Sequence, residues 1–205
     1  MRETSANIAV LVSGGGTNLQ ALIDAERSGI IQSGHICLVI ANNAGAYALE
    51  RANNADIATA VITKKGCGGS QEAFEDALIA ALEAADIDLI VLAGFMSILS
   101  ERFTRRFEKR IINVHPSLIP SFCGQGFYGL RVHEAALAKG VKVTGATVHY
   151  VNEIPDGGEI ILQKAVSVRE NDTPETLQKR VMRLAEWKIL PAATEKVCAQ
   201  IIADR

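Results

Sequence analysis

The sequence predicts an α/β fold, with an open, mostly parallel twisted sheet, helices on both faces and an antiparallel addition near the C-terminal end. Three observations predict it. Short apolar runs alternate with segments of helical period, which is typical of parallel sheets. Glycines gather where these runs end, as they do in Rossmann-like folds. After residue 143 the pattern changes to two extended segments and a long helix.

The elements follow in order from the apolar pattern. Predicted strands of the parallel part occupy residues 8–12, 36–41, 59–62, 89–93 and 111–114. Intervening helices are expected to begin near Asn18, Ala46 and Ser70, and another to cover 100–107. A helix beginning near Leu130 precedes two extended segments at 144–151 and 159–168. The last helix is expected over 173–203, kinked or divided by Pro191.

Length and composition describe one globular domain over residues 1–205. The motifs considered below divide it into an expected phosphate-binding half, 1–110, and an expected catalytic half, 111–205. With 21 basic and 23 acidic residues, the chain offers no field for a polyanion, so no nucleic-acid partner is expected. No apolar run reaches the ~18 residues that a membrane span needs. Residues 1–7 lack a signal-peptide pattern, so a cytoplasmic location is expected. Four scattered cysteines predict neither a metal site nor a disulfide framework.

A glycine-rich segment, Ser-Gly-Gly-Gly-Thr-Asn at residues 13–18, lies between the first predicted strand and its helix. Unpaired backbone N–H groups and the positive end of the helix dipole meet there, an arrangement that binds phosphate. The alternative is a tight structural turn. The segment lacks the lysine of a P-loop, and Leu19 occupies the third glycine position of the dinucleotide fingerprint. A monophosphate ester therefore fits better than a triphosphate or dinucleotide.

Asn113 and His115 lie at the end of the fifth predicted strand, where side-chain alternation places them on one face. The alternative is a structural histidine with a capping asparagine. Downstream, Asp156 precedes two glycines; a carboxylate there would orient an imidazole and raise its pKa, although an Asp-Gly turn explains the same residues. His149 is expected to line the cavity behind His115.

Four segments together resemble the phosphoribosylglycinamide formyltransferase family of purine biosynthesis, along nearly the whole chain. These are Ile-Ala-Val-Leu-Val-Ser-Gly-Gly-Gly-Thr-Asn-Leu-Gln at 8–20, Val-Leu-Ala-Gly-Phe-Met at 91–96, Asn-Val-His-Pro-Ser-Leu-Ile-Pro at 113–120, and Val-His-Tyr at 148–150 leading to Asp-Gly-Gly at 156–158. The first segment discriminates this family; the third and the aspartate recur across folate formyltransferases and formyltetrahydrofolate hydrolases.

The resemblance implies that a formyl group moves from 10-formyltetrahydrofolate, a cosubstrate, to the amine of glycinamide ribonucleotide, without a metal. Asn113 and His115 would stabilise the oxyanion, and Asp156 would orient His115 and help to relay a proton. The implied partners are these small molecules, with the chain a monomer or weak homodimer. Implied ribonucleotide contacts are Gly15, Gly16, Thr17, Asn18, Arg183 and Glu186. Implied folate contacts are Met96, Ser97, Ile98, Leu99, Val151, Asn152, Glu153, Ile154 and Asp156. By the same resemblance, residues 111–205 are expected to be the folate-binding as well as the catalytic half.

Three positions depart from the family pattern. Ser97 stands where many members have Arg, Trp187 replaces a common His, and Gln125 replaces Lys in a Gly-rich loop at 121–129. The loop contacts and the contact to the folate tail therefore do not follow directly from the resemblance. Arg183 lies one α-helical turn before Glu186 and is expected on the same face, with a solvated helix pair as the alternative.

Other functions remain to be distinguished. Formyltetrahydrofolate hydrolase uses water as the acceptor, but its relatives carry a further domain before the catalytic unit. Transfer to methionyl-tRNA would need an RNA-binding domain and a basic surface. A catalytically silent phosphoribosyl- or folate-binding module is a third possibility, which the three polar residues of the site disfavour. A dinucleotide oxidoreductase is the weakest because its glycine fingerprint is missing.

Overall fold

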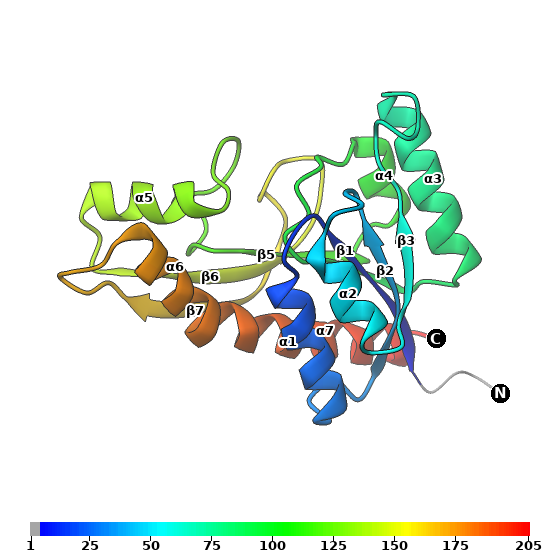
Figure 1. Cartoon of the computed structure of the whole chain (residues 1–205). Coiled ribbons are helices and arrows are strands. Elements are labelled where there is room, and N and C mark those ends of the chain that lie inside the picture. Colours follow the sequence, from blue (N-terminus) through cyan, green and yellow to red (C-terminus); the bar gives the residue numbers. More distant parts are fainter. Residues whose placement is uncertain (1–4) are drawn as a thin grey trace.

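A computed structural model describes residues 5–205. Residues 1–4, which belong to the segment 1–7 where no signal peptide is expected, lie outside the described residues. Its centre is a seven-stranded sheet in the order β3-β2-β1-β4-β5-β6-β7 (Figure 1). The strands are β1 (Ala6–Val12), β2 (Gly34–Ala41), β3 (Ala58–Val61), β4 (Leu89–Leu92), β5 (Ile111–His115), β6 (Val143–Tyr150) and β7 (Ile160–Ser167).

The first five strands are parallel, whereas β6 is antiparallel to both β5 and β7. The predicted fold class, including its antiparallel addition, is therefore confirmed. The helices are α1 (Thr17–Arg27), α2 (Tyr47–Asn53), α3 (Gln71–Ala84), α4 (Glu101–Arg106), α5 (Leu130–Lys139), α6 (Pro174–Val181) and α7 (Trp187–Ala203), with a π-helical turn, η1 (Met182–Glu186), between the last two.

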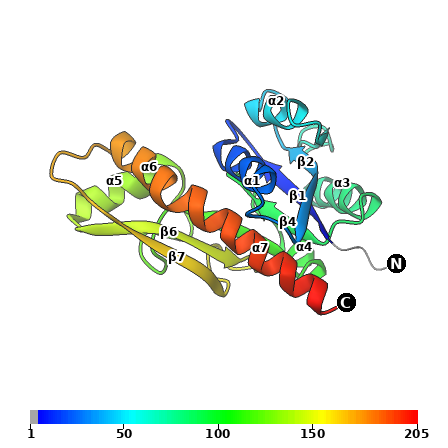
Figure 2. The ribbon, with the colours of Figure 1, turned by 90° about the horizontal axis from the view of Figure 1, so that it is seen from below.

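Two apolar layers cover the sheet. Alternate residues of β1 belong to different layers: Ile8 and Val10 pack with α1, α2 and α7, whereas Ala9 and Leu11 pack with α3 and α4. This alternation explains why the parallel strands are almost continuously apolar, since both of their faces are buried. Figure 2 shows α6 and α7 following one another across the sheet. No helix within residues 5–205 combines the length and apolar character needed to cross a membrane.

Several helices begin at residues that suit this position chemically. Ser70 and Ser100 accept hydrogen bonds from the third residues of α3 and α4 through their hydroxyls. Thr173 forms a reciprocal capping box with Thr176, and Pro174 occupies the first turn of α6, where its missing N–H is not needed.

The expected break of the last helix at Pro191 is wrong in position. The helix changes at the π-helical turn η1, and Pro191 lies inside α7. Proline removes the N–H that would bond four residues back, and here that acceptor belongs to Trp187, the first residue of α7. The lost bond therefore falls at the junction that the π-turn has already loosened.

The order in which strands are added to the sheet changes side at β1: β2 and β3 lie on one side of it, and β4 and all later strands lie on the other. Open α/β sheets bind ligands at such switch points, outside the carboxyl ends of the strands. The two strand ends are joined here, because the backbone N–H of Met96 donates to Ser13 Oγ at 2.8 Å. A cavity opens beside this junction.

Candidate active site

The cavity has a volume of about 770 Å³ and lies at the carboxyl ends of β1, β4 and β5. It collects residues from six separate parts of the chain: the start of α1, the loop after β4, the end of β5, the loop before α5, the segment after β6, and η1. Its polar lining includes Asn18, Asn113, His115, Asp156 and Glu186. Side chains up to 168 positions apart in sequence thus share one space.

The predicted cluster of Asn113, His115 and Asp156 is present. Asn113 and His115 are two residues apart on β5 and both line the cavity, as alternation requires. Asp156 lies on the loop after β6 in a left-handed conformation with φ of 56°. Its Oδ2 is 3.4 Å from His115 Nδ1 and accepts the N–H of Gly124 at 2.8 Å.

The hydrogen bonds of His115 identify which ring nitrogen is protonated. Its Nε2 donates to the carbonyl of Phe122 at 2.8 Å, and a carbonyl oxygen is an acceptor only. In the neutral ring Nδ1 therefore carries a lone pair, which faces the carboxylate of Asp156. A proton taken up at Nδ1 would lie between the imidazole and Asp156.

His149 contributes a second such lone pair. Its Nδ1 donates to the carbonyl of Tyr150 at 2.8 Å, which leaves Nε2 to accept an N–H from Asn113 at 3.2 Å. The same Nε2 is 3.5 Å from Asp156 Oδ1. Two buried imidazoles, 4% and 2% exposed, thus surround one carboxylate, and a single added proton would link an imidazole to it.

The charge states of this cluster differ in one respect from the expectation. Burial lowers the pKa of His115 below its usual 6.5 and outweighs the opposing effect of Asp156, so the ring is neutral near pH 7. We expected the carboxylate to favour the imidazolium. Burial opposes the ionisation of Asp156, but its pKa is still lowered, because an imidazole that is protonated pairs with the carboxylate and the Gly124 N–H donates to it. The cluster is therefore prepared to accept a proton.

The glycine-rich loop lies next to the cavity, which Asn18 lines and Gly15 and Gly16 do not. Gly16 caps α1 in a left-handed conformation with φ of 70°, and no side chain caps α1 within residues 5–205. A Cβ at Gly16 would lie 2.6 Å from Ala48 Cβ, so only glycine fits. Helix α2 holds the loop in place: Ala48 N–H donates to the Gly14 carbonyl at 3.0 Å, and Arg51 Nε to that of Gly15 at 2.8 Å.

Asn18 and Glu186 meet at the same edge, where Asn18 Nδ2 donates to Glu186 Oε2 at 2.8 Å. Glu186 is 6% exposed, and burial raises its pKa to about 7 despite this bond. Asn18 Oδ1 is buried and has no partner among residues 5–205. The pair therefore contains one buried acceptor without a hydrogen-bond partner in the described part of the chain.

Arg183 does not share this face. It is exposed and does not line the cavity, whereas Glu186 does. Both residues belong to η1. Because a π-helical turn contains more residues than an α-helical one, positions three apart no longer align. The α-helical spacing used for the expectation fails for this reason.

The expected folate-side residues surround a smaller hollow of about 150 Å³ that adjoins the catalytic cluster. It is lined by Leu92, Phe95, Ser97, Ile98, Leu99, Asn113, His149, Val151, Asn152, Glu153, Ile154, Pro155 and Asp156. Met96 lines the larger cavity instead. Ser97 Oγ accepts a hydrogen bond from Asn42 at 2.8 Å, so this side chain is fixed toward β2.

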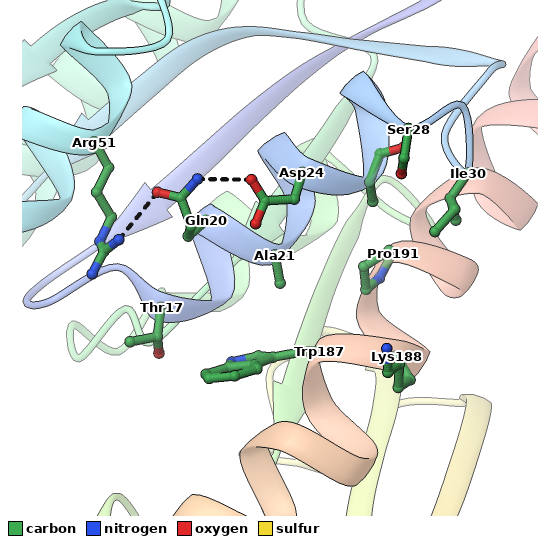
Figure 3. A pocket seen from close by; sticks show the side chains of 11 residues that line it. Thr17, Gln20, Ala21, Asp24, Ser28, Ile30, Arg51, Trp187, Lys188 and Pro191 are labelled. Atoms are coloured by element: carbon green, nitrogen blue, oxygen red, sulfur yellow. Dashed lines mark hydrogen bonds between the residues drawn. The ribbon is translucent and has the colours of Figure 1, made fainter.

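A separate cavity of about 370 Å³ lies on the other side of α1, between it and α7 (Figure 3). Trp187 and Pro191 form one wall, and Gln20 links Arg51 to Asp24 along α1. Thr17 lines this cavity rather than the catalytic one.

Some features of the site have no signal in the sequence. The carbonyl of Phe122 and the N–H of Gly124 come from the loop before α5, whose glycines mark a turn but not its direction. The bond between Asn18 and Glu186 joins segments 168 residues apart. Residues 5–205 contain no group of three or more His, Cys, Asp or Glu side chains placed to hold a metal ion.

Comparison with known proteins places this geometry in context. The formyl transferase family model matches residues 6–194. The phosphoribosylglycinamide formyltransferase of Haemophilus influenzae is 45% identical over 184 residues, which cover 90% of this chain and 83% of that protein. The bovine trifunctional purine biosynthetic protein adenosine-3 is 47% identical over 199 residues, 97% of this chain but only 19% of that longer protein.

Solved structures agree in fold as well as sequence. Glycinamide ribonucleotide transformylase 1 of Symbiobacterium toebii superposes with a TM-score of 0.89 at 41% identity, covering 97% of this chain and 90% of that one. The phosphoribosylglycinamide formyltransferase of Coxiella burnetii, solved in complex with CHES, gives a TM-score of 0.87 at 42% identity, covering 96% and 88%. The likeness therefore extends over the cavity and all the segments that line it.

Proposed function

Because the chain belongs to the phosphoribosylglycinamide formyltransferase family, we propose that it is an enzyme that transfers a formyl group from 10-formyltetrahydrofolate to the amine of glycinamide ribonucleotide. The products are formylglycinamide ribonucleotide and tetrahydrofolate, in purine biosynthesis. The observation that carries the proposal is the gathering of Asn113, His115 and Asp156 in one cavity, with the start of α1 at its edge. An acyl-transfer centre thus lies beside an anion site.

The ribonucleotide phosphate binds at the start of α1, at the backbone of Gly15, Gly16 and Thr17. Helix N-termini hold anions with their free N–H groups, and the local dipole favours negative charge. Asn18 and Glu186 lie next along the cavity edge, where the unpartnered Asn18 Oδ1 receives a donor from the sugar or the glycinamide. This orientation directs the glycinamide amine toward Asn113. Arg183 is exposed, so its proposed contact to the phosphate requires its long side chain to extend over the surface to the start of α1.

The folate ring occupies the hollow beside the catalytic cluster. Its apolar wall contains Leu92, Ile98, Leu99 and Val151, and the segment 152–156 supplies polar backbone groups. A flat heteroaromatic ring needs this combination of apolar faces and a few polar contacts. Its N10-formyl group then lies next to Asn113 and Asp156, which line both the hollow and the main cavity.

Catalysis begins when the glycinamide amine attacks the formyl carbon and an oxyanion forms. Asn113 donates one amide N–H to His149, and its second N–H is directed to the oxyanion. The Nε2–H of His115, which now donates to the Phe122 carbonyl, is the other donor at this position. A charged oxygen is a stronger acceptor than a neutral carbonyl, so the developing charge attracts this donor. Loss of one such donor typically costs about 3 kcal/mol of barrier.

The attacking nitrogen becomes an ammonium and must lose a proton, whereas the leaving N10 of the folate must gain one. The ammonium proton passes through water and the Asp156 carboxylate to the Nδ1 lone pair of His115, which lies 3.4 Å from that carboxylate and is the final proton acceptor. A proton held there is stabilised by the ionised carboxylate and is then returned to N10 by the same route. No covalent enzyme intermediate is needed, because the amine itself is the nucleophile.

The test is a transfer assay with purified protein, glycinamide ribonucleotide and 10-formyltetrahydrofolate. Transfer should require both substrates and be lost in Asn113→Ala. The matched control is His35→Ala, which removes an imidazole that is 62% exposed and pairs with Glu26 on the surface. Rapid deformylation without the amine would favour the hydrolase instead. Binding of both ligands without turnover would favour a silent binding module.

We further propose one formyltransferase domain over residues 1–205, divided as expected into 1–110 and 111–205. The partners are the two small molecules, and the chain acts in the cytoplasm as a monomer or weak homodimer. The reaction as proposed uses no metal, since the oxyanion donors and the proton acceptor are all side chains of this cavity.

A further inference from the structure

The loop at residues 94–99, between β4 and α4, carries part of the apolar wall of both the hollow and the main cavity. Leu99 is buried in the core and Phe95 packs against that core, whereas Met96 is 54% exposed and Ile98 is 74% exposed. Exposed apolar side chains gain little from the core, so burial does not fix the direction of Met96 and Ile98. Gly94 begins the loop with φ of 73°, a conformation that favours glycine. Interactions other than hydrophobic packing must therefore fix the middle of the loop.

Polar bonds hold the loop on the strand side. The N–H of Met96 donates to Ser13 Oγ at 2.8 Å, and Ser97 Oγ accepts from Asn42 at 2.8 Å. These bonds tie the middle of the loop to the ends of β1 and β2. The other side of the loop, at Ile98, is held from α3.

Gln71, the first residue of α3, reaches the loop directly. Its Nε2 donates to the carbonyl of Ile98 at 3.0 Å and also to Oε1 of Glu75, one turn later, at 2.7 Å. The carbonyl of Ile98 is thereby fixed, and its exposed side chain is turned toward the two hollows that it lines.

Glu75 anchors this arrangement. It is 1% exposed, although a buried carboxylate is costly unless donors surround it. Ser100 supplies two donors, its N–H at 2.7 Å and its hydroxyl, and Gln71 supplies a third. Arg102 Nη2 lies 3.7 Å from the same carboxylate. Glu75 therefore fixes Ser100, where the loop ends and α4 begins.

We infer that Gln71 and Glu75 are positioning residues that hold the folate-side loop in its binding shape before the cosubstrate arrives. The inference rests on the proposed function, since it assigns the hollow to folate. Neither residue lines the two hollows, so both act through Ile98 and Ser100. A preformed wall raises affinity because the loop need not be ordered on binding. Because Ser97 Oγ already bonds to Asn42, recognition of the folate at this wall depends on the shape of the wall and not on a hydrogen bond from Ser97.

Two variants test the inference. Gln71→Ala removes the donor to Ile98 without burying a new group, and Glu75→Gln replaces one acceptor oxygen of the carboxylate by an amide N–H. We expect KM for 10-formyltetrahydrofolate to rise about tenfold in each, because small misplacements of binding groups have large effects. KM for glycinamide ribonucleotide and kcat should change less than about twofold. Calorimetric affinity for tetrahydrofolate should fall by the same factor as KM rises.

The matched control is Glu83→Gln near the end of the same helix. Glu83 is exposed and pairs with Arg106 at 2.9 Å, away from Glu75 and the loop, so its replacement should leave all three constants unchanged. Variants that melt earlier but keep the wild-type KM and tetrahydrofolate affinity would overturn the inference. So would an equal rise in both KM values. Absence of transfer by the wild-type protein would instead contradict the proposed function, which keeps the two failures distinct.

Discussion

The two ends of the catalytic cavity are built from different groups. The catalytic end is built from side chains: the imidazoles of His115 and His149 lie 3.4 Å and 3.5 Å from the Asp156 carboxylate, and Asn113 bonds to His149. At the phosphate end, the loop before α1 offers backbone N–H groups and is fixed by hydrogen bonds from α2 to its own carbonyls. The same cavity thus connects a cluster of ionisable side chains to a binding site made mainly of backbone groups.

The two ends of the cavity should therefore tolerate different substitutions. The catalytic end depends on the identity and protonation of single side chains, so truncation there should reduce turnover more than binding. The phosphate end depends on the path of the backbone, so it should respond to an added Cβ or an added charge. Ribonucleotide binding can be followed at this end by fluorescence, because Trp187 is the only tryptophan and follows Glu186 directly.

The largest effect is expected for His115→Ala. The change removes the proton acceptor and one oxyanion donor, so kcat should fall by about 10³-fold or more. Ribonucleotide affinity, measured by the fluorescence of Trp187, should stay within about twofold of wild type because the cradle is untouched. Equal turnover in the two proteins would break the assignment of chemistry to this end.

Asp156→Asn should lower kcat by about 10²-fold and change its pH dependence. Asp156 is the leading influence that raises the pKa of His115 against burial, so its loss lowers that pKa further. The neutral imidazole is the acceptor, hence the rate falls as pH drops through this pKa. The acid limb of kcat/KM should therefore move to lower pH in the variant. An unmoved limb, recorded between about pH 5 and 8, would contradict the role of His115.

Gly16→Ala tests the backbone end. Its Cβ would lie 2.6 Å from Ala48 Cβ at a residue with φ of 70°, so the loop must shift. We expect roughly 2–3 kcal/mol of lost stability and a clear rise in KM for the ribonucleotide. Gly14→Ala is the control, since no described atom lies within 4 Å of its Cβ and Gly14 is not a proposed phosphate contact. Denaturant unfolding and ribonucleotide titration of both variants distinguish a shift of the loop backbone from the effect of adding a methyl group anywhere in the loop.

Asn18→Asp adds a charge where a dianion is proposed to bind. The variant also loses the donor to Glu186, whose carboxyl is buried. Ribonucleotide affinity should fall about tenfold, whereas tetrahydrofolate affinity should not change. If ribonucleotide affinity is unchanged in this variant, the phosphate does not bind at the start of α1.

Glu186→Gln should have the smallest effect, and it appears in stability. The folded protein raises the pKa of Glu186 from 4.5 to about 7, so the native state binds this proton more tightly than the unfolded chain. Wild-type stability therefore declines as pH rises through this interval, and the glutamine variant lacks this decline. Above pH 7 we expect the variant to be more stable than wild type by about 1–2 kcal/mol. Parallel stability profiles would show that Glu186 is ionised throughout.

The sequence predicts much of this fold because local chemistry and global position agree. Apolar runs locate all seven strands to within two residues, and capping serines mark the starts of α3 and α4. Alternation along β5 alone places Asn113 beside His115. The glycine-rich segment predicts the start of α1 because a left-handed residue is required there.

What the sequence does not predict depends on long-range contacts or on shifts of helical phase. The backbone groups that bond to His115 and Asp156 come from the loop at 121–129, where the Phe122 carbonyl accepts from His115 and the Gly124 N–H donates to Asp156; neither group has a residue signature. The neutral state of His115 depends on its burial, which outweighs a carboxylate visible in the sequence. Arg183 was placed on the wrong face because the pattern assumes α-helical spacing throughout.

The π-helical turn between α6 and α7 divides what would otherwise be one long helix into two helices whose side chains are rotated relative to each other about the common axis. One added residue rotates everything after it by about 100° about the common axis. Leu177 and Val181 are buried before the turn and Leu190 and Val197 after it, each set in its own register. Deleting a single residue from 182–185 would leave an unbroken helix of good propensity, yet it would turn either Glu186 or the whole buried stripe of α7 away from its partners. The number of residues at this joint matters more than their identity.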